Sequence, residues 1–262
     1  MQILLTNDDG IYAPGLAAME HELRRLGDVS VVAPLTEQSG VGHAITYLTP
    51  LMAREVFDDA EDYPGGHRGW AVEGSPADCV KLAVSELCPR RPELIVSGIN
   101  GGQNAGINVL YSGTVAAAIE GAFFGITSIA VSLEYDDNAK FRQAAQLALA
   151  IIEQILAQKD AGPQLFNLNI PTAALETPGE VRVVPMATAP WGESFEKRLD
   201  PRGRPYYWAY GAQPTASADE DTDLSALRDG QITLTPLEFD MTHRDKVEQM
   251  RSWQLAVPAV ST

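Results

Sequence analysis

The sequence predicts a three-layer α/β protein with a mostly parallel sheet and helices on both faces. Up to about residue 170, short apolar segments alternate with amphipathic or alanine-rich ones, as in repeated strand–helix–strand units. The short segments are apolar along their whole length, which is typical of strands in a sheet buried on both faces. Beyond Pro171 this alternation stops, and two further strands and a hairpin are expected.

The first predicted strand, residues 2–6, ends in two adjacent carboxylates, Asp8 and Asp9, followed by Gly10. Ligands of open α/β sheets bind just beyond the carboxyl ends of the strands. Two carboxylates that converge there need a cation, and Mg²⁺ and Mn²⁺ accept oxygen ligands of this kind. The alternative is that both aspartates only form a turn and cap the next helix.

The next segments complete a strand–helix–strand unit. Residues 14–26 have Pro14 at a helix start and Gly27 just past its end, and residues 29–34 form a strand that we expect to run parallel to the first. The further elements expected are a strand at 45–52, an exposed and mobile insertion at 58–68, a helix from 76 to about 87, a strand at 93–97, a helix at 115–124, a strand at 126–133, a helix at 139–158 and strands at 165–170, 181–186 and 232–237.

Three loops leave the same edge of this predicted sheet and carry oxygen donors. They hold Asp8 with Asp9, Ser39, and Asn100. Residues 112–114 (Ser-Gly-Thr) begin a helix, whose free N–H groups and partial positive charge suit an anion. Each residue alone is also explained by a turn or a cap, but together they predict a divalent ion beside a phosphate.

The size of the energies involved distinguishes anion binding from catalysis at such a site. A helix terminus stabilises an anion by about 0.3–2 kcal/mol, whereas hydrolysis of a phosphate monoester requires rate factors up to about 10²¹. A helix end cannot supply this effect, but a metal ion can contribute much of it.

Residues 191–211 are polar and aromatic around a strong turn signal at 200–203, which predicts an exposed hairpin. A lone hairpin is marginal in water, so its aromatic side chains need cover from another chain or from another part of this one. These side chains are Tyr206, Tyr207, Trp208 and Tyr210.

Composition limits the partners and the compartment. The chain of 262 residues has 19 basic and 35 acidic residues, a net charge of −16, which disfavours binding to nucleic acid or to anionic membranes. The two cysteines, Cys79 and Cys88, are expected to be buried among apolar side chains, which suits a reducing compartment, and residues 1–10 are not expected to act as a signal peptide. We therefore expect a cytoplasmic protein.

Other nucleotide and hydrolase motifs are absent from the sequence. Neither Gly-x-Gly-x-x-Gly nor Gly-x-x-x-x-Gly-Lys-Ser/Thr is present, and Ser39 is not in a Gly-x-Ser-x-Gly elbow. The four histidines have no metal-ligand spacing, although His43 is expected near the site.

Four ordered motifs carry a resemblance to a known family. They are residues 4–10 (LLTNDDG), 33–40 (APLTEQSG), 97–104 (SGINGGQN) and 111–121 (YSGTVAAAIEG). On these motifs the chain resembles the survival protein SurE family of nucleotidases. The resemblance implies a divalent-metal-dependent phosphatase acting on nucleoside 5′-monophosphates, on 3′-monophosphates and sometimes on polyphosphate.

The resemblance also implies roles for particular residues. One divalent ion per subunit, Mg²⁺ or Mn²⁺, is expected on Asp8, Asp9, Ser39 and Asn100, with Asp8 and Asp9 as the catalytic pair. The phosphate is expected on Asn104, Ser112, Gly113 and Thr114.

The family likeness further implies a single domain over residues 1–262. Its three-layer, Rossmann-like core with the metal site is expected in 1–185. A C-terminal β-hairpin arm with closing strands is expected in 186–262 and is expected to join homodimers or homotetramers. Two alternatives remain at this point, a phosphatase that forms a covalent phosphate on Asp8 and a nucleotide-binding sensor without catalysis.

Overall fold

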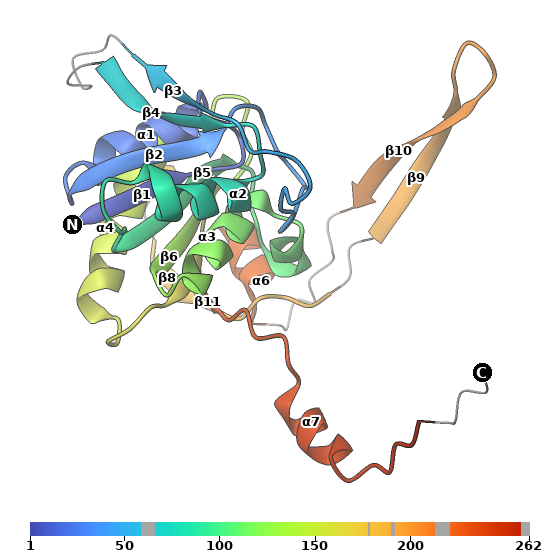
Figure 1. The fold of residues 1–262 in the computed structure, drawn as a ribbon. Coiled ribbons are helices and arrows are strands. Elements are labelled where there is room, and N and C mark those ends of the chain that lie inside the picture. The colour runs from blue at the N-terminus through green and yellow to red at the C-terminus, as the bar shows by residue number, and fades with distance from the viewer. Residues whose placement is uncertain (59–65, 178, 190–191, 213–220, 258–262) are drawn as a thin grey trace.

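The computed structural model describes residues 1–58, 66–177, 179–189, 192–212 and 221–257 (Figure 1). The strands are β1 (Gln2–Thr6), β2 (Asp28–Pro34), β3 (Ala53–Phe57), β4 (His67–Val72), β5 (Leu94–Gly101), β6 (Thr127–Leu133), β7 (Leu165–Ile170), β8 (Val181–Val183), β9 (Gly192–Leu199), β10 (Pro205–Ala212) and β11 (Ile232–Leu237). The helices are α1 (Pro14–Leu23), α2 (Pro76–Leu82), α3 (Gly113–Phe123), α4 (Phe141–Gln158), α5 (Ala173–Glu176), α6 (Asp223–Arg228) and α7 (Arg244–Met250), with a π-helical turn η2 (Ala83–Leu87) and a 3₁₀ turn η3 (Gly106–Leu110).

Nine of the described strands form one sheet, in the order β3-β4-β2-β1-β5-β6-β7-β11-β8. β1 pairs in parallel with β2 and β5, and parallel pairing continues to β4 on one side and to β6 and β7 on the other. β3 and β11 are antiparallel to β4 and β7. The predicted mostly parallel α/β sheet is confirmed, and its antiparallel strands lie toward its two ends.

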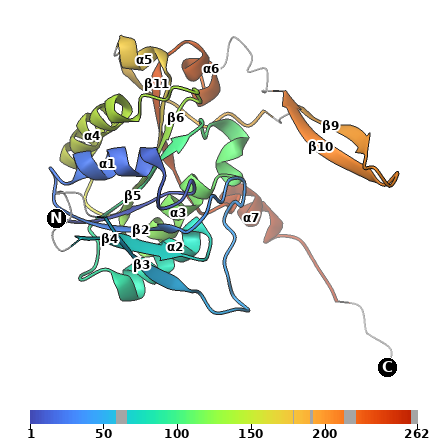
Figure 2. The same cartoon turned by 90° about the horizontal axis from the view of Figure 1, so that it is seen from above.

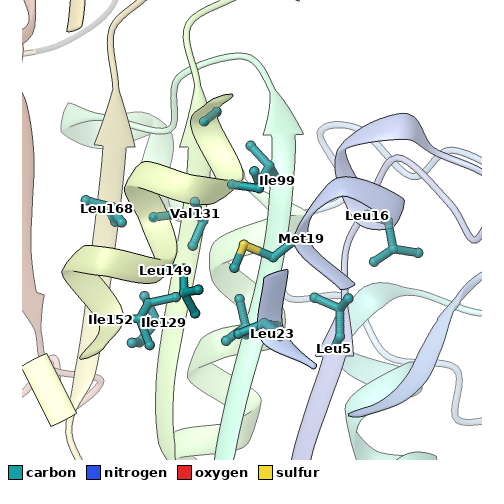
Figure 3. Packing of buried hydrophobic residues seen from close by; sticks show 14 of the residues in the cluster. Leu5, Leu16, Met19, Leu23, Ile99, Ile129, Val131, Leu149, Ile152 and Leu168 are labelled. Atoms are coloured by element: carbon teal, nitrogen blue, oxygen red, sulfur yellow. The ribbon is translucent and has the colours of Figure 1, made fainter. Parts of the chain in front are cut away.

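Helices cover both faces of this sheet. α1 packs beside α4 on one face, and α2 packs beside α3 on the other (Figure 2). On the first face, apolar side chains of α1 and α4 meet those of β1, β5, β6 and β7 (Figure 3). Each fully buried side chain of this size contributes about 1.5–3 kcal/mol. The labelled members are Leu5, Leu16, Met19, Leu23, Ile99, Ile129, Val131, Leu149, Ile152 and Leu168.

Several predicted boundaries are wrong. Residues 45–52 form no strand, because Pro50 lacks an N–H and the chain there is held by side chains, with the Thr46 N–H donating to Asp78; the edge strand β3 follows instead. The insertion expected at 58–68 ends earlier, since β4 begins at His67, and residues 59–65 lie outside the described part of the chain.

Other elements differ in extent. The helix expected at 76–87 is regular only to Leu82, and then widens into η2, where the Cys88 N–H donates to the Ala83 carbonyl. β5 extends beyond the strand expected at 93–97 and ends at Gly101. β8 is shorter than the strand expected at 181–186. β4, α5, α6 and α7 were not expected from the sequence pattern.

The hairpin is confirmed. β9 and β10 pair only with each other among the described strands, and Asp200 and Gly203 close the turn. The hairpin stands away from the sheet, as does the C-terminal segment with α7 (Figure 1). None of the helices in the described residues combines the length and the apolar character that a bilayer-crossing helix requires.

Candidate functional site

The candidate site lies where the chain order of the sheet reverses. β1 lies between β2 and β5, so the chain leaves β1 in one direction first and in the other later. A pocket of about 290 Å³ opens at this point, where open α/β sheets bind ligands. Six predicted site residues line it, namely Asp8, Asp9, Ser39, Asn100, Asn104 and Ser112.

The turn after β1 is fixed by its own side chains. Asn7 donates from Nδ2 to the Gly10 carbonyl at 3.0 Å and accepts the Gly10 N–H on Oδ1 at 3.2 Å. Gly10 has a φ of +99°, which disfavours a residue with a side chain. The Asp8 carbonyl accepts the Gln38 N–H at 2.8 Å and thereby joins this turn to the loop that carries Ser39.

Asp8 is nearly inaccessible, with 4% of its surface exposed. Its Oδ1 accepts a hydrogen bond from the Thr114 hydroxyl. Burial raises the pKa of Asp8 to about 6, the Thr114 hydrogen bond opposes this, and the charge of Asp9 adds to it. The charged form of Asp8 is therefore costly unless a cation lies beside it.

Asp9 is half-buried, and its Oδ2 accepts the Gly101 N–H at 3.2 Å, so β5 orients it. Burial raises the pKa of Asp9, the Gly101 hydrogen bond opposes this, and the charge of Glu37 adds to it. Two carboxylates that are both disfavoured as anions, in one pocket, form an environment suited to a cation.

The neutral oxygen donors come from the other two loops. Ser39 is exposed and donates its hydroxyl to Glu37 Oε1 at 2.8 Å. Asn100 donates from Nδ2 to the Gly102 carbonyl at 2.6 Å. A carbonyl only accepts, so the Asn100 amide nitrogen must face Gly102, and its Oδ1 is the end directed elsewhere.

The start of α3 differs in detail from expectation. Ser112 caps the helix, with its Oγ accepting the Val115 N–H at 3.1 Å. Thr114 is fully buried, and its hydroxyl contacts Asp8 rather than the pocket. A Cβ on Gly113 would lie 2.9 Å from the Asp8 Cβ. The start of α3 therefore packs directly on Asp8, and a larger residue at 113 would press on that carboxylate.

Sequence reasoning missed the five other lining residues, which are Gly40, Gly101 and three residues with polar side chains, Glu37, Asn108 and Tyr111. Glu37 lies two residues before Ser39 in the same loop, so its oxygen donors were available as a signal. His43 is near the site but does not line it. Its Nε2 lies 2.8 Å from Glu120 Oε2, and its ring stacks on Phe123 with centroids 5.3 Å apart.

The donor set fits a hard divalent ion. Carboxylate, hydroxyl and amide oxygens gather in one pocket, and Mg²⁺ and Mn²⁺ favour oxygen ligands. No group of three or more His, Cys, Asp or Glu side chains with metal-site geometry occurs within the described residues. The expected metal ligands that line this pocket are two carboxylates, Asp8 and Asp9, and two neutral oxygen donors, Ser39 and Asn100.

Fold and pocket together define a Rossmann-like α/β protein with an acidic, oxygen-lined site beside a helix start. Comparison with known proteins makes this specific. The family model described as "Survival protein SurE" matches residues 3–193. The chain belongs to the survival protein SurE family.

Relatives cover nearly the whole chain. A protein of Rhodopirellula baltica named 5′-nucleotidase SurE is 58% identical over 97% of this chain and 99% of its own. A protein of Heliobacterium modesticaldum with the same name is 41% identical over 97% of this chain and 92% of its own. The crystal structure of the SurE protein from Aquifex aeolicus aligns with a TM-score of 0.81 and 35% identity, over 96% of this chain and 98% of its own.

Proposed function

We propose that this chain is a phosphatase that hydrolyses nucleoside 5′-monophosphates to nucleoside and phosphate, with Mg²⁺ or Mn²⁺ as cofactor. The observation that carries this proposal is the pocket at the switch point, which brings Asp8, Asp9, Ser39 and Asn100 together beside the start of α3. Relatives named 5′-nucleotidase, at 58% and 41% identity over nearly the whole chain, support the same activity. Activity on 3′-monophosphates and on polyphosphate is part of the proposal.

The residues divide into two groups by chemistry. Asp8, Asp9, Ser39 and Asn100 hold one ion per subunit, and such an ion supplies Lewis-acid stabilisation of charge on a phosphoryl group. Thr114 holds the Asp8 carboxylate in place by its hydrogen bond.

The phosphate is bound on the other side of the pocket. Asn104 and Ser112 line this part, and the start of α3 at Gly113 adds backbone N–H groups and the partial positive charge of a helix N-terminus. The Ser112 hydroxyl already caps α3, so in this proposal it is the backbone there that contributes most to the anion.

Water is the proposed nucleophile. A covalent phosphate on Asp8 is less compatible with the geometry, since Asp8 is only 4% exposed and one of its oxygens already accepts from Thr114. Asp9 is more accessible, but its Oδ2 is held by Gly101. Both carboxylates therefore serve better as ligands than as attacking groups.

The decisive experiment is a substrate panel with the purified chain. AMP, other nucleoside 5′- and 3′-monophosphates and polyphosphate are incubated with Mn²⁺, Mg²⁺ or a chelator, and released phosphate is measured. We expect release from 5′-monophosphates that the chelator abolishes. Binding of AMP without phosphate release would instead support a nucleotide sensor, and acid-stable label on Asp8 would support the covalent route.

The proposal also covers the oligomeric state, the domain organisation and the cellular compartment. We propose a homodimer or homotetramer joined through the β9–β10 arm, because Phe195, Tyr207 and Trp208 are 58–62% exposed on the single chain. We treat the chain as one domain, since β11 of the C-terminal part joins the main sheet. Cys79 and Cys88 are both free thiols, which suits the cytoplasm.

A further inference from the structure

A buried polar cluster lies behind the pocket loop that carries Asn104. Asn167 and Asn169 on β7 are both fully buried. The Asn104 N–H donates to Asn169 Oδ1 at 2.8 Å. The Asn104 carbonyl accepts from Nδ2 of Asn167 at 2.7 Å and from Nδ2 of Asn169 at 3.1 Å. Both polar groups of one backbone residue are thus held by two side chains more than sixty positions later in the chain.

Two further contacts hold the same stretch. The Asn104 side chain donates from Nδ2 to the Ser132 hydroxyl of β6 at 2.8 Å. The Gly106 N–H donates to Oδ2 of Asp223, a fully buried carboxylate at the start of α6, at 2.7 Å. The other oxygen of Asp223 accepts the Ala187 N–H at 2.9 Å.

Such a cluster is costly if its only purpose is to fill the core. Each buried amide or carboxylate must regain in hydrogen bonds what it loses in hydration, and apolar side chains of similar size avoid this cost. The Asn167 Oδ1 has no hydrogen-bond partner within the described residues, but the backbone N–H and carbonyl of Asn104 are both bonded by the cluster, and such bonds specify one backbone conformation. Here the conformation that they specify is that of Asn104, which lines the same pocket as Asp8 and Asp9.

We propose that Asn167, Asn169 and Asp223 are positioning residues that hold the backbone from Asn104 to Gly106, so that Asn104 is preorganised to contact the phosphate. This inference rests on the proposed function, because it takes a phosphate group as the ligand. Preorganised contacts bind without the cost of ordering a loop at each encounter. The three residues touch Asn104 or Gly106 and do not line the pocket.

The test compares Asn169→Ala and Asn167→Ala with a matched control. Thr233 of β11 lies opposite Asn169 in the sheet, is fully buried, and its hydroxyl has no hydrogen-bond partner within the described residues. Thr233→Val therefore changes a buried polar group beside the cluster without touching Asn104. For each variant, KM and kcat for AMP, inhibition by inorganic phosphate, the activation constant for Mn²⁺ and Tm are measured.

Asn169→Ala removes two of the three backbone contacts of Asn104. We expect its KM and its inhibition constant for phosphate to rise about tenfold, with a smaller rise for Asn167→Ala. The Mn²⁺ activation constant should stay unchanged, because Asp8 and Asp9 are held by other partners. Thr233→Val should match the wild type in every kinetic constant.

A lower Tm for Asn169→Ala with unchanged KM and phosphate inhibition would show that the cluster is only structural and would overturn the proposal. If Asn169→Ala does not fold, Asn167→Ala and Asp223→Asn give the same test, since Asp223→Asn preserves shape while removing one acceptor. Calorimetry of phosphate binding in the presence of Mn²⁺ requires no turnover. It therefore tests the positioning role even if AMP proves not to be a substrate, and equal phosphate affinity in all variants would reject it.

Discussion

The pocket and the hairpin arm differ in how they satisfy their side chains. In the pocket, partners within the chain hold each group: Asp8 accepts from Thr114, and Asp9 accepts from Gly101. In the arm, β9 and β10 pair only with each other among the described strands, and Tyr207 and Trp208 are 58% and 59% exposed. The two carboxylates of the pocket thus have partners within the chain, whereas these aromatic side chains of the arm are left largely uncovered.

Because of this difference, we expect activity to depend on the pocket and assembly to depend on the arm. The pocket residues come from the turn after β1, the loop after β2, the end of β5 and the segment that leads from β5 to the start of α3, all of which belong to the packed part of one chain. Their variants should change activity without regard to assembly. Variants of the arm should change assembly first, because aromatic side chains are frequent anchors at protein interfaces.

The largest effect is expected at the carboxylates. Asp9→Asn, or Asp8→Asn, removes one of the two carboxylates proposed to hold the ion, so metal-dependent turnover should fall more than about a hundredfold. The fold should survive, because the pKa of both groups is raised chiefly by burial and a neutral amide avoids that cost. Kinetics at limiting Mn²⁺ and a thermal unfolding curve measure the two effects, with Asp160→Asn on the surface as control.

Wild-type turnover at limiting metal in either variant would remove that carboxylate from the metal site. A loss of folding in both would show instead that the carboxylates are structural. Asp160 lies in the exposed segment after α4, so its variant should match the wild type in both measurements.

A second prediction tests the contact between the start of α3 and the Asp8 carboxylate. A Cβ at Gly113 would lie 2.9 Å from the Asp8 Cβ and 3.1 Å from Asp8 Oδ2. Gly113→Ala should therefore displace Asp8 and reduce turnover about tenfold or more, with a loss of stability of about 1–3 kcal/mol. Higher Mn²⁺ should restore part of the activity, because the displaced Asp8 carboxylate is a proposed metal ligand.

Gly179→Ala is the matched control, since a Cβ there has no atom within 4 Å among the described residues. It should leave both turnover and Tm unchanged. If Gly113→Ala behaves like Gly179→Ala, the close packing of α3 on Asp8 has no role in the site.

The core and most of the pocket followed from the sequence for a physical reason. β1 and β6 are buried along their whole length, and β7 and α3 along most of theirs, so composition alone marks them. The carboxyl ends of these parallel strands lie at one edge of the sheet, and α3 begins there. Six of the eight expected site residues line the pocket. A short motif at the end of a buried strand is a local signal that needs no long-range contact.

Other features depend on contacts that no local pattern shows. The Thr114 hydroxyl was expected to face the phosphate, but its partner Asp8 is 106 positions away. The role of His43 depends on Glu120 of α3, and the strand expected at 45–52 is replaced by a loop held by Asp78. In each case a hydrogen bond between residues distant in the sequence determines the local structure. Propensity and periodicity describe only neighbouring residues and therefore could not predict it.

A third effect concerns stability within the packed part of the chain. Glu120 is buried and accepts hydrogen bonds from His43 at 2.8 Å and Lys81 at 3.2 Å. Burial acts to raise the pKa of Glu120, but these two partners together lower it below its ordinary value. Glu120→Gln should cost about 1–3 kcal/mol at pH 7, measured by denaturant unfolding.

The sign of the pH dependence follows from that lowered pKa. A carboxyl with a lower pKa in the folded state adds stability above its ordinary value of 4.5 and loses it as pH falls through the folded value. The gap between wild type and Glu120→Gln should therefore be full at pH 7 and close below about pH 4.5. Glu153→Gln on the exposed face of α4 should show no such gap, and a gap independent of pH would rule out an electrostatic origin.

The smallest effect on the packed core is expected when the arm is removed. Residues 193–210 are deleted and bridged with a short Gly/Ser linker, and mass is measured by light scattering. The mass should fall to that of a smaller assembly, because the exposed Phe195, Tyr207 and Trp208 are lost with the hairpin. Ordering a hairpin costs about 1–2 kcal/mol per residue, so an arm without a partner would not repay its own cost.

The dependence of Tm on protein concentration is a second test of whether the arm joins subunits. If the arm joins subunits, association stabilises the wild type by mass action, and its Tm should rise with protein concentration. The Tm of the deletion variant should be independent of concentration and close to the wild-type value at high dilution, because β9 and β10 pair with no strand of the main sheet. Trp208→Ser should give an intermediate result, with weaker association and an unchanged core. A deletion variant as oligomeric as its parent would show that other surfaces hold the assembly, and the C-terminal segment with α7, whose Trp253 and Leu255 are 53% and 80% exposed, would be the next surface to test.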